Sequence, residues 1–196
     1  MDNTRLSQQS QFLLEIDRLK NVIRRSILTG VDRRENSAEH SWHLAVMALV
    51  LAEHSDEPVD VTRVVKMLLV HDLVEIDAGD TYCYDPSAVI DQSMREHQAA
   101  ARIFGLLPDD QAGELHMLWK EFEARQTPDA LFANTLDRLM PLLHNYYTQG
   151  RTWKDNDINR SQVLFRNQPA EEISQTIWEF SKELIEDAVS KGYLKG

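Results

Sequence analysis

Apolar residues recur every three to four positions along most of the chain, which is the spacing of one face of an α-helix. This pattern predicts helices at about residues 12–23, 37–53, 60–76, 86–106, after Pro108, from Thr127 onward and at about 169–190. Residues 150–168 are the polar exception, where we expect a long loop with one short turn. No segment alternates as a strand does, and no break divides the chain. The sequence therefore predicts an all-α, single-domain protein spanning residues 1–196.

Capping residues mark where several of these helices should begin. Ser37 and Asp60 are predicted N-caps, and Thr127 is followed by a proline that suits the first helical position. Pro108 is expected at a similar first position of its own helix. Pro141 lies inside the helix that starts near Thr127, and it predicts a bend there.

Composition limits the classes of partner. The chain has 196 residues, of which 42% are hydrophobic, so it can bury a core of its own. Its formal net charge of −11 repels nucleic-acid polymers and anionic membranes, but it still allows a small phosphorylated substrate in a local basic pocket.

The single cysteine, Cys83, cannot form an intramolecular disulfide. The first residues lack the apolar core of a signal peptide, and no apolar run approaches the roughly 18 residues that a membrane span needs. We therefore expect a cytoplasmic location.

The adjacent pair His71-Asp72 ends the apolar run VVKMLLV, where burying unpaired polar groups would be costly. A divalent metal ion bound by both side chains would offset this cost. His40 upstream and Asp137 downstream would complete a mixed nitrogen and oxygen ligand set. Such a set suits Mn²⁺, Co²⁺, Fe²⁺, Zn²⁺ or Mg²⁺. Each residue also has an ordinary interpretation, since a lone histidine is usually a core residue and Asp137 could pair with Arg138.

The remaining histidines carry weaker signals. His43 shares a helical face with His40, and we expect it to be a core residue or to support a ligand. The others have no metal-like context and are expected to be ordinary: His54, His97, His116 and His144.

Four segments resemble a subgroup of the HD-domain hydrolases that contains the bacterial 5′-deoxynucleotidases: LKNVIRR, ENSAEHSWH, HDLVEIDAGD and LDRLMPLL. The resemblance covers about residues 19–147, and it implies a helical HD-domain bundle with that segment as its core and the helix at about 169–190 packed on it. It also implies one divalent cation bound by His40, His71, Asp72 and Asp137. The implied reaction removes phosphate from deoxyribonucleoside 5′-monophosphates.

The same resemblance assigns roles around that cation. Arg24 matches a phosphate-binding arginine, Glu75 is expected to position or deprotonate water, and Asp80 to assist proton transfer or orient the substrate. Arg25 stands where the nucleotidases have a tryptophan that helps to select deoxyribose, so we expect a weaker preference for that sugar. The loop TYCYDP also departs from the proline-containing stretch of those enzymes, and its Tyr82 and Tyr84 either stack on a nucleoside or pack within the loop.

Three interpretations of function remain open. The first is a nucleoside 5′-monophosphate phosphohydrolase, and the second is a hydrolase of another small phosphomonoester or of a nucleotide di- or triphosphate. The third is a nucleotide-binding regulatory module without catalysis, which the presence of both Glu75 and Asp80 disfavours. Similar nucleotidases are dimers, so a homodimer is also expected, with Trp119 or Trp178 as exposed surface to bury.

Overall fold

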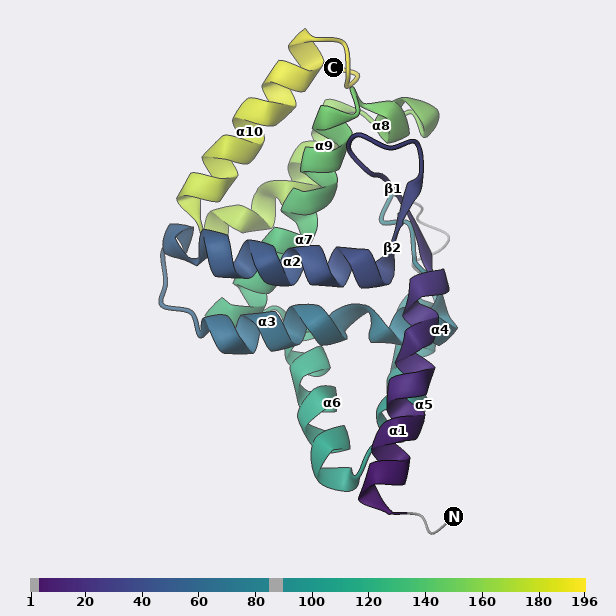
Figure 1. Ribbon diagram of the computed structural model, residues 1–196. Helices are drawn as coiled ribbons and strands as arrows, with labels where there is room; N and C mark the ends of the chain where they lie inside the picture. Colours follow the sequence, from purple (N-terminus) through teal and green to yellow (C-terminus); the bar gives the residue numbers. More distant parts are fainter. Residues whose placement is uncertain (1–3, 85–89) are drawn as a thin grey trace.

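The computed structural model describes residues 4–84 and 90–196, and these residues form a bundle of helices (Figure 1). The predicted all-α class is confirmed. The α-helices are α1 (Arg5–Ile16), α2 (Ser37–Leu51), α3 (Val61–Val70), α4 (Glu75–Ala78), α5 (Gln92–Phe104), α6 (Asp109–Ala124), α7 (Pro128–Tyr147), α8 (Arg151–Asp155), α9 (Arg160–Asn167) and α10 (Gln175–Ser190). Short 3₁₀ turns are η1 (Asp17–Asn21), η2 (Ala52–His54), η3 (His71–Val74) and η4 (Gln168–Glu172).

The centre of the bundle is formed by α2, α3 and α7, each of which packs against the other two. Leu44, Leu68 and Leu136, one from each of these helices, are fully buried in the main core. The C-terminal helix α10 packs on α7, α9 and η4 and adds Ile185 to the same core. A second buried cluster joins η3 to α5 and α6 around Phe104. In Figure 1, α2 and α3 run side by side across the middle of the molecule.

A small hairpin was not predicted from the sequence. Strands β1 (Ile23–Ile27) and β2 (Arg34–Asn36) pair antiparallel, with an irregular register between their ends. The end of β1 buries Ser26 and Ile27 in succession, so its side chains lack the apolar–polar alternation that identifies a strand. The expectation of a helix continuing to Ile23 was therefore wrong.

The polar stretch at 150–168 is also not a loop, since it contains α8 and α9. These short helices bury few side chains, chiefly Trp153 and Val163, and so show little periodicity. A capping box between Asn159 and Gln162 begins α9. The last helix starts at Gln175 rather than near Pro169, which lies in η4.

The helix starts are partly as predicted. Asp60 and Thr127 are N-caps, as expected. The cap of α2 is Asn36 rather than Ser37, and Pro108 is itself the N-cap of α6. The predicted start of a helix at Pro86 lies outside the described residues.

Two further expectations need correction. The predicted helix to Ile76 ends at Val70, where the chain tightens into the 3₁₀ turn η3. Trp119 and Trp178 are 1% and 7% exposed, so neither supplies surface for a partner. No helix in the part of the chain that the structure describes has the length and apolar character needed to cross a membrane.

Candidate active site

His71 and Asp72 lie where α3 changes into η3, and both are buried. The ring Nδ1 of His71 lies 2.8 Å from the carbonyl oxygen of Leu68. If Nδ1 carries the proton of the neutral ring, it donates to this carbonyl. The lone pair of Nε2 is then free to bind a metal ion. Nε2 lies 3.0 Å from Asp72 Oδ1 but has no hydrogen-bond partner in the described part of the chain.

The two other predicted ligands meet this pair from α2 and α7. His40 Nε2 lies 2.9 Å from Asp137 Oδ1, and the same carboxylate oxygen lies 3.8 Å from His71 Nε2. Ligand atoms of His40, His71 and Asp72 all lie within 4.8 Å of one another. Two imidazoles, two carboxylates and an unpartnered buried ring nitrogen form a donor set that fits a divalent cation.

Arg24 extends from β1 into this group of carboxylates. Its guanidinium donates to Asp72 Oδ2 at 2.6 Å, and lies 3.6 Å from Glu75 and 3.7 Å from Asp80. A more distant contact of 4.0 Å joins it to Asp137. Glu35 on β2 also lies 4.0 Å from it, so the site surrounds the permanently charged group of Arg24 with five acids from separate parts of the chain.

These contacts shift the pKa values of the ligands. Burial alone would raise the pKa of Asp72, but His71 and Arg24 outweigh it and hold this pKa at about 2. Burial would also raise the pKa of Asp137, but His40, His71 and Arg24 outweigh burial and lower this pKa. Burial lowers the pKa of His71, yet the Asp72 charge overcomes this effect and raises it to about 9.

Glu75 follows η3 and is held by a neighbour on α2. Ser37 Oγ donates to Glu75 Oε2 at 2.7 Å. Burial, and then the charge of Asp72, raise the pKa of Glu75 well above its ordinary value. Burial also raises the pKa of Asp80, which follows Gly79 at the end of α4. Both side chains can therefore hold a proton nearer to neutral pH than ordinary carboxyls do.

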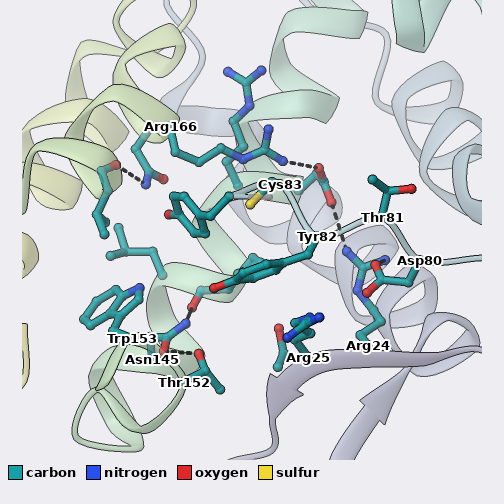
Figure 2. Close-up of a pocket in the computed structure, with 18 residues that line it drawn as sticks. Arg24, Arg25, Asp80, Thr81, Tyr82, Cys83, Asn145, Thr152, Trp153 and Arg166 are labelled. Atoms are coloured by element: carbon teal, nitrogen blue, oxygen red, sulfur yellow. Dashed lines mark hydrogen bonds and ion pairs between the residues drawn. The ribbon is translucent and has the colours of Figure 1, made fainter. Parts of the chain in front are cut away.

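Arg25 lies at the edge of a pocket of about 110 Å³ that opens beside Asp80 and Asp137 (Figure 2). Its exposed guanidinium lies 4.4 Å from the ring centre of Tyr82 and donates to Asn156 Oδ1 at 3.2 Å. Tyr82 therefore packs on a cation within the protein, while its ring still lines the pocket. Tyr84 and Trp153 line the same pocket.

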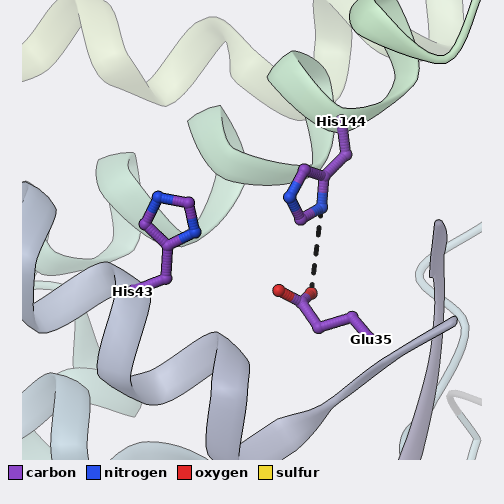
Figure 3. Close-up of side chains that lie close together, drawn as sticks. All are labelled: Glu35, His43 and His144. Atoms are coloured by element: carbon purple, nitrogen blue, oxygen red, sulfur yellow. Dashed lines mark ion pairs between the residues drawn. The ribbon is translucent and has the colours of Figure 1, made fainter. Parts of the chain in front are cut away.

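The sequence did not reveal a second group of side chains behind His40. Glu35 on β2 is 1% exposed, and its Oε2 lies 3.4 Å from His40 Nδ1 and 3.9 Å from His144 Nδ1. Figure 3 shows the Glu35 carboxylate with the rings of His43 and His144 turned toward it. Ligand atoms of these three residues lie within 4.8 Å of one another. Glu35 is thus suited to orient His40.

Two expectations change with this arrangement. His144 was expected to be ordinary, yet it is buried beside Glu35, and burial lowers the pKa of His144. His43 was expected in the core or as ligand support; it is exposed and so is not a core residue, but its ring lies beside Glu35. A carboxylate in a three-residue strand gave no sequence signal, because only the fold brings it beside His40.

A profile that describes the HD domain matches residues 16–178, most of the chain. The chain belongs to the HD-domain family. A crystal structure described as "Predicted metal-dependent phosphohydrolase from Magnetospirillum magnetotacticum MS-1" is 50% identical over 98% of this chain and 96% of that chain, with a TM-score of 0.91. The HD-domain fold implies a divalent cation, and the group around His71 contains side chains that can bind one.

HD-domain relatives with curated names share less sequence identity with this chain than the Magnetospirillum protein does. The human protein named "5′-deoxynucleotidase HDDC2" is 34% identical over 134 residues, which cover 68% of this chain and 64% of that protein. The zebrafish (Danio rerio) protein of the same name is 32% identical over 139 residues, covering 69% of this chain and 68% of that protein. This chain thus spans slightly less than two thirds of the length of the human relative.

Proposed function

We propose that this protein is a metal-dependent phosphohydrolase that removes phosphate from nucleoside or deoxynucleoside 5′-monophosphates. The observation that supports this most directly is one buried centre that combines His40, His71, Asp72 and Asp137 with Arg24 and Glu75. The names of its relatives, 5′-deoxynucleotidase and metal-dependent phosphohydrolase, agree with this chemistry.

The cofactor in this proposal is one divalent cation, held by His40, His71, Asp72 and Asp137. Mn²⁺, Co²⁺, Mg²⁺, Fe²⁺ and Zn²⁺ all suit a ligand set of two imidazoles and two carboxylates. When bound, the cation would lower the pKa of a water molecule and polarise the phosphate.

The side chains around this centre have separate roles in the proposed reaction. The guanidinium of Arg24 binds a phosphate oxygen, for which a permanently charged planar fork is suited. The carboxylate of Glu75 takes a proton from the attacking water, and Ser37 holds it in position. The new bond joins the water oxygen to phosphorus, and the ester bond to the 5′-oxygen breaks. Asp80 orients the substrate or gives the departing oxygen its proton.

The pocket beside Arg25 is the proposed position of the nucleoside. Tyr82, Tyr84 and Trp153 offer aromatic surface there, and Asn145 offers a polar amide. Because Arg25 lacks the bulk of an indole, we propose only a weak preference for deoxyribose over ribose.

The proposal also includes the cellular location, the partners, the domain organisation and the oligomeric state. A free Cys83 thiol and a net charge of −11 favour a cytoplasmic enzyme that does not bind nucleic-acid polymers or membranes. We further propose that the whole chain is one HD domain, with its core at about residues 19–147, and that it forms a homodimer.

A panel of nucleoside monophosphates, assayed for released phosphate with Mn²⁺ or Co²⁺, tests the function. We expect release from AMP and dAMP at rates of the same order, and a stronger preference for dAMP in Arg25→Trp. Asp72→Ala should lose both bound metal and phosphate release, because it removes a charged ligand. Full metal content and activity in Asp72→Ala, or no release from any monophosphate by the metal-loaded protein, would contradict the proposal.

The main alternative is a hydrolase of another small phosphomonoester or of a nucleotide di- or triphosphate. The same panel, extended to those compounds, separates it from the first proposal. A regulatory module would bind nucleotides without releasing phosphate.

A further inference from the structure

Arg138 is a mostly buried cation that forms no ion pair among the described residues. It follows Asp137 on α7, its residue is 7% exposed, and its buried Nε has no hydrogen-bond partner among those residues. In the described part of the chain, no carboxylate lies within the 4.0 Å of an ion pair from its guanidinium, Asp137 included. The ordinary alternative for Asp137, an ion pair with Arg138, is therefore absent there. Burial, and then the positive charges of Arg166 and Arg125, lower the pKa of Arg138.

Arg166 adds a second cation from α9. Its guanidinium lies 3.8 Å from Asp137 Oδ2, while Arg24 approaches Oδ1 of the same carboxylate at 4.0 Å. Figure 2 shows Arg166 and Arg24 entering the pocket from different sides. The positive charge of Arg166 is thus only partly compensated, because Asp137 is also shared with His40.

Both arginines border a hollow that adjoins the metal ligands. Arg138, Arg166 and Arg125 line a space of about 680 Å³. Arg166 and Arg125 also line the space of about 300 Å³ that contains His71 and Asp72. Two exposed acids, Glu171 and Glu172, lie at the wall of the larger space, but in the described residues neither forms an ion pair with Arg138 or Arg166.

An arginine that is mostly buried and unpaired is costly, since its guanidinium stays charged and loses part of its hydration. Two neighbouring guanidinium groups also repel each other. An anion between them would remove both costs, and phosphate oxygens match the arginine fork in shape and charge. The phosphate that is hydrolysed already has Arg24 and the metal ligands, so it does not account for Arg138.

We propose that the substrate carries a second phosphoryl group, which Arg138 and Arg166 bind in the hollow beside the metal centre. This inference rests on the proposed phosphohydrolase function and concerns the substrate of the same site. The second phosphoryl group stays on the product, and Arg24 holds the phosphate that water attacks. In a nucleoside 3′,5′-bisphosphate the second group is on the sugar, and the ester bond to the 5′-oxygen breaks as in the proposed reaction. In a nucleoside 5′-diphosphate the second group is the α-phosphate, and the anhydride bond breaks instead.

Binding without turnover tests this subsite directly. The probes are AMP, adenosine 5′-(α,β-methylene)diphosphate and adenosine 3′,5′-bisphosphate, titrated by calorimetry into the full chain in the absence of added metal. At least one probe with two phosphoryl groups should bind about tenfold or more tightly than AMP, the magnitude of one charge-assisted bond. Which of the two does so distinguishes the anhydride from the bisphosphate.

Arg166→Gln should abolish this difference in affinity between AMP and the probe with two phosphoryl groups. This side chain is 35% exposed, so its replacement should not prevent folding. The matched control is Arg160→Gln on the same helix, because Arg160 pairs with Glu186 at the surface. The control should bind every probe as the wild type does.

Arg138→Met provides a second test, because it should raise the melting temperature of the ligand-free protein but reduce the effect of an added anion on that temperature. Removing an uncompensated buried charge should raise the melting temperature of the ligand-free protein. The same variant should lose the stabilisation that inorganic pyrophosphate gives to the wild type. A structural role for Arg138 predicts the reverse, a lower melting temperature.

Equal affinity of the wild type for all three probes, or an unchanged preference in Arg166→Gln, would overturn the proposal. Its failure differs from failure of the proposed function. Phosphate release from monophosphates with no preference for a second phosphoryl group refutes the subsite alone. Tight, Arg166-dependent binding of a probe without any hydrolysis supports the subsite and refutes the enzyme.

Discussion

The imidazole of His71 can hold either a proton or a metal ion, and the two compete. In the metal-free protein burial lowers its pKa, but Asp72 overcomes this and raises it to about 9, above the ordinary value of about 6.5. A cation requires the neutral ring, since a metal ligand must give up its proton. The apparent metal affinity should therefore fall by about tenfold for each pH unit below pH 9. Competition with a chelator across this range measures it.

The same shift predicts an effect on stability with a definite sign. Because the folded-state pKa lies above the unfolded one, the proton on His71 stabilises the metal-free fold fully below about pH 6.5. This stabilisation is lost as the pH rises to about 9. Denaturant titrations of metal-free protein should show that loss. A metal affinity and a metal-free stability that are both constant over this interval would contradict the shifted pKa.

Glu75 should affect chemistry rather than metal binding. Glu75→Ala is expected to keep the metal and to lose roughly 10²–10⁴ in turnover, the usual contribution of a positioned acid or base. Ser37→Ala removes the donor that holds Glu75, and because this hydrogen bond lowers the pKa of Glu75, the ascending limb of the pH profile should move to higher pH. The matched control is Ser41→Ala one turn further along α2, whose hydroxyl has no hydrogen-bond partner in the described chain. Loss of metal in Glu75→Ala would instead make Glu75 a ligand.

At the level of elements, the start of α2 positions the site. Asn36 accepts from the Glu39 backbone N–H at 2.9 Å, and Glu39 accepts from the Asn36 N–H at 3.2 Å. This capping box frees the hydroxyl of Ser37 to reach Glu75, and His40 follows within the first turn. The sequence predicted a cap in this region but assigned it one residue late.

Asn36→Ala should lower the free energy of unfolding by about 0.5–2 kcal/mol, as the loss of an N-cap does, and should also weaken metal binding. The control is Asn159→Ala, which removes the capping box of α9, a helix without a proposed metal ligand. It should cost similar stability and leave the metal dissociation constant unchanged. Denaturant titration and metal titration of both variants make the comparison. If the two variants bind metal equally well, the cap of α2 has no influence on the site.

Some elements could be predicted from sequence because one side of each is strongly buried. The apolar run before His71 is an example, since Val64, Met67 and Leu68 recur at helical spacing. The hairpin and the helices at 150–168 could not, because they bury only isolated side chains such as Ile27, Trp153 and Val163. The order His…His-Asp…Asp identified the side chains that meet at the centre. Glu35 and Arg138 depend on tertiary contacts, and no local pattern marks them.

For the whole molecule, α2 presents an unusual surface. Its inner side is buried against α3 and α7, yet its outer side also carries apolar residues, spaced to form one stripe. This stripe comprises Trp42, Val46, Leu49 and Val50, which are 65%, 39%, 65% and 62% exposed. A helix that is apolar on all sides is normally covered on all sides. The proposed homodimer would cover it by pairing the same face of two chains, as twofold symmetry allows.

Leu49→Glu should therefore convert the dimer to a monomer, because it places a charge within this stripe, more than two helical turns from His40 on α2. Light scattering coupled to gel filtration measures the mass, and circular dichroism verifies that helix content is retained. Met117→Glu is the matched control, since Met117 is 64% exposed on α6, outside the stripe. It should leave the mass unchanged. A wild-type protein that is monomeric at micromolar concentration, or a Leu49→Glu variant that remains a dimer, would exclude α2 as the dimer interface.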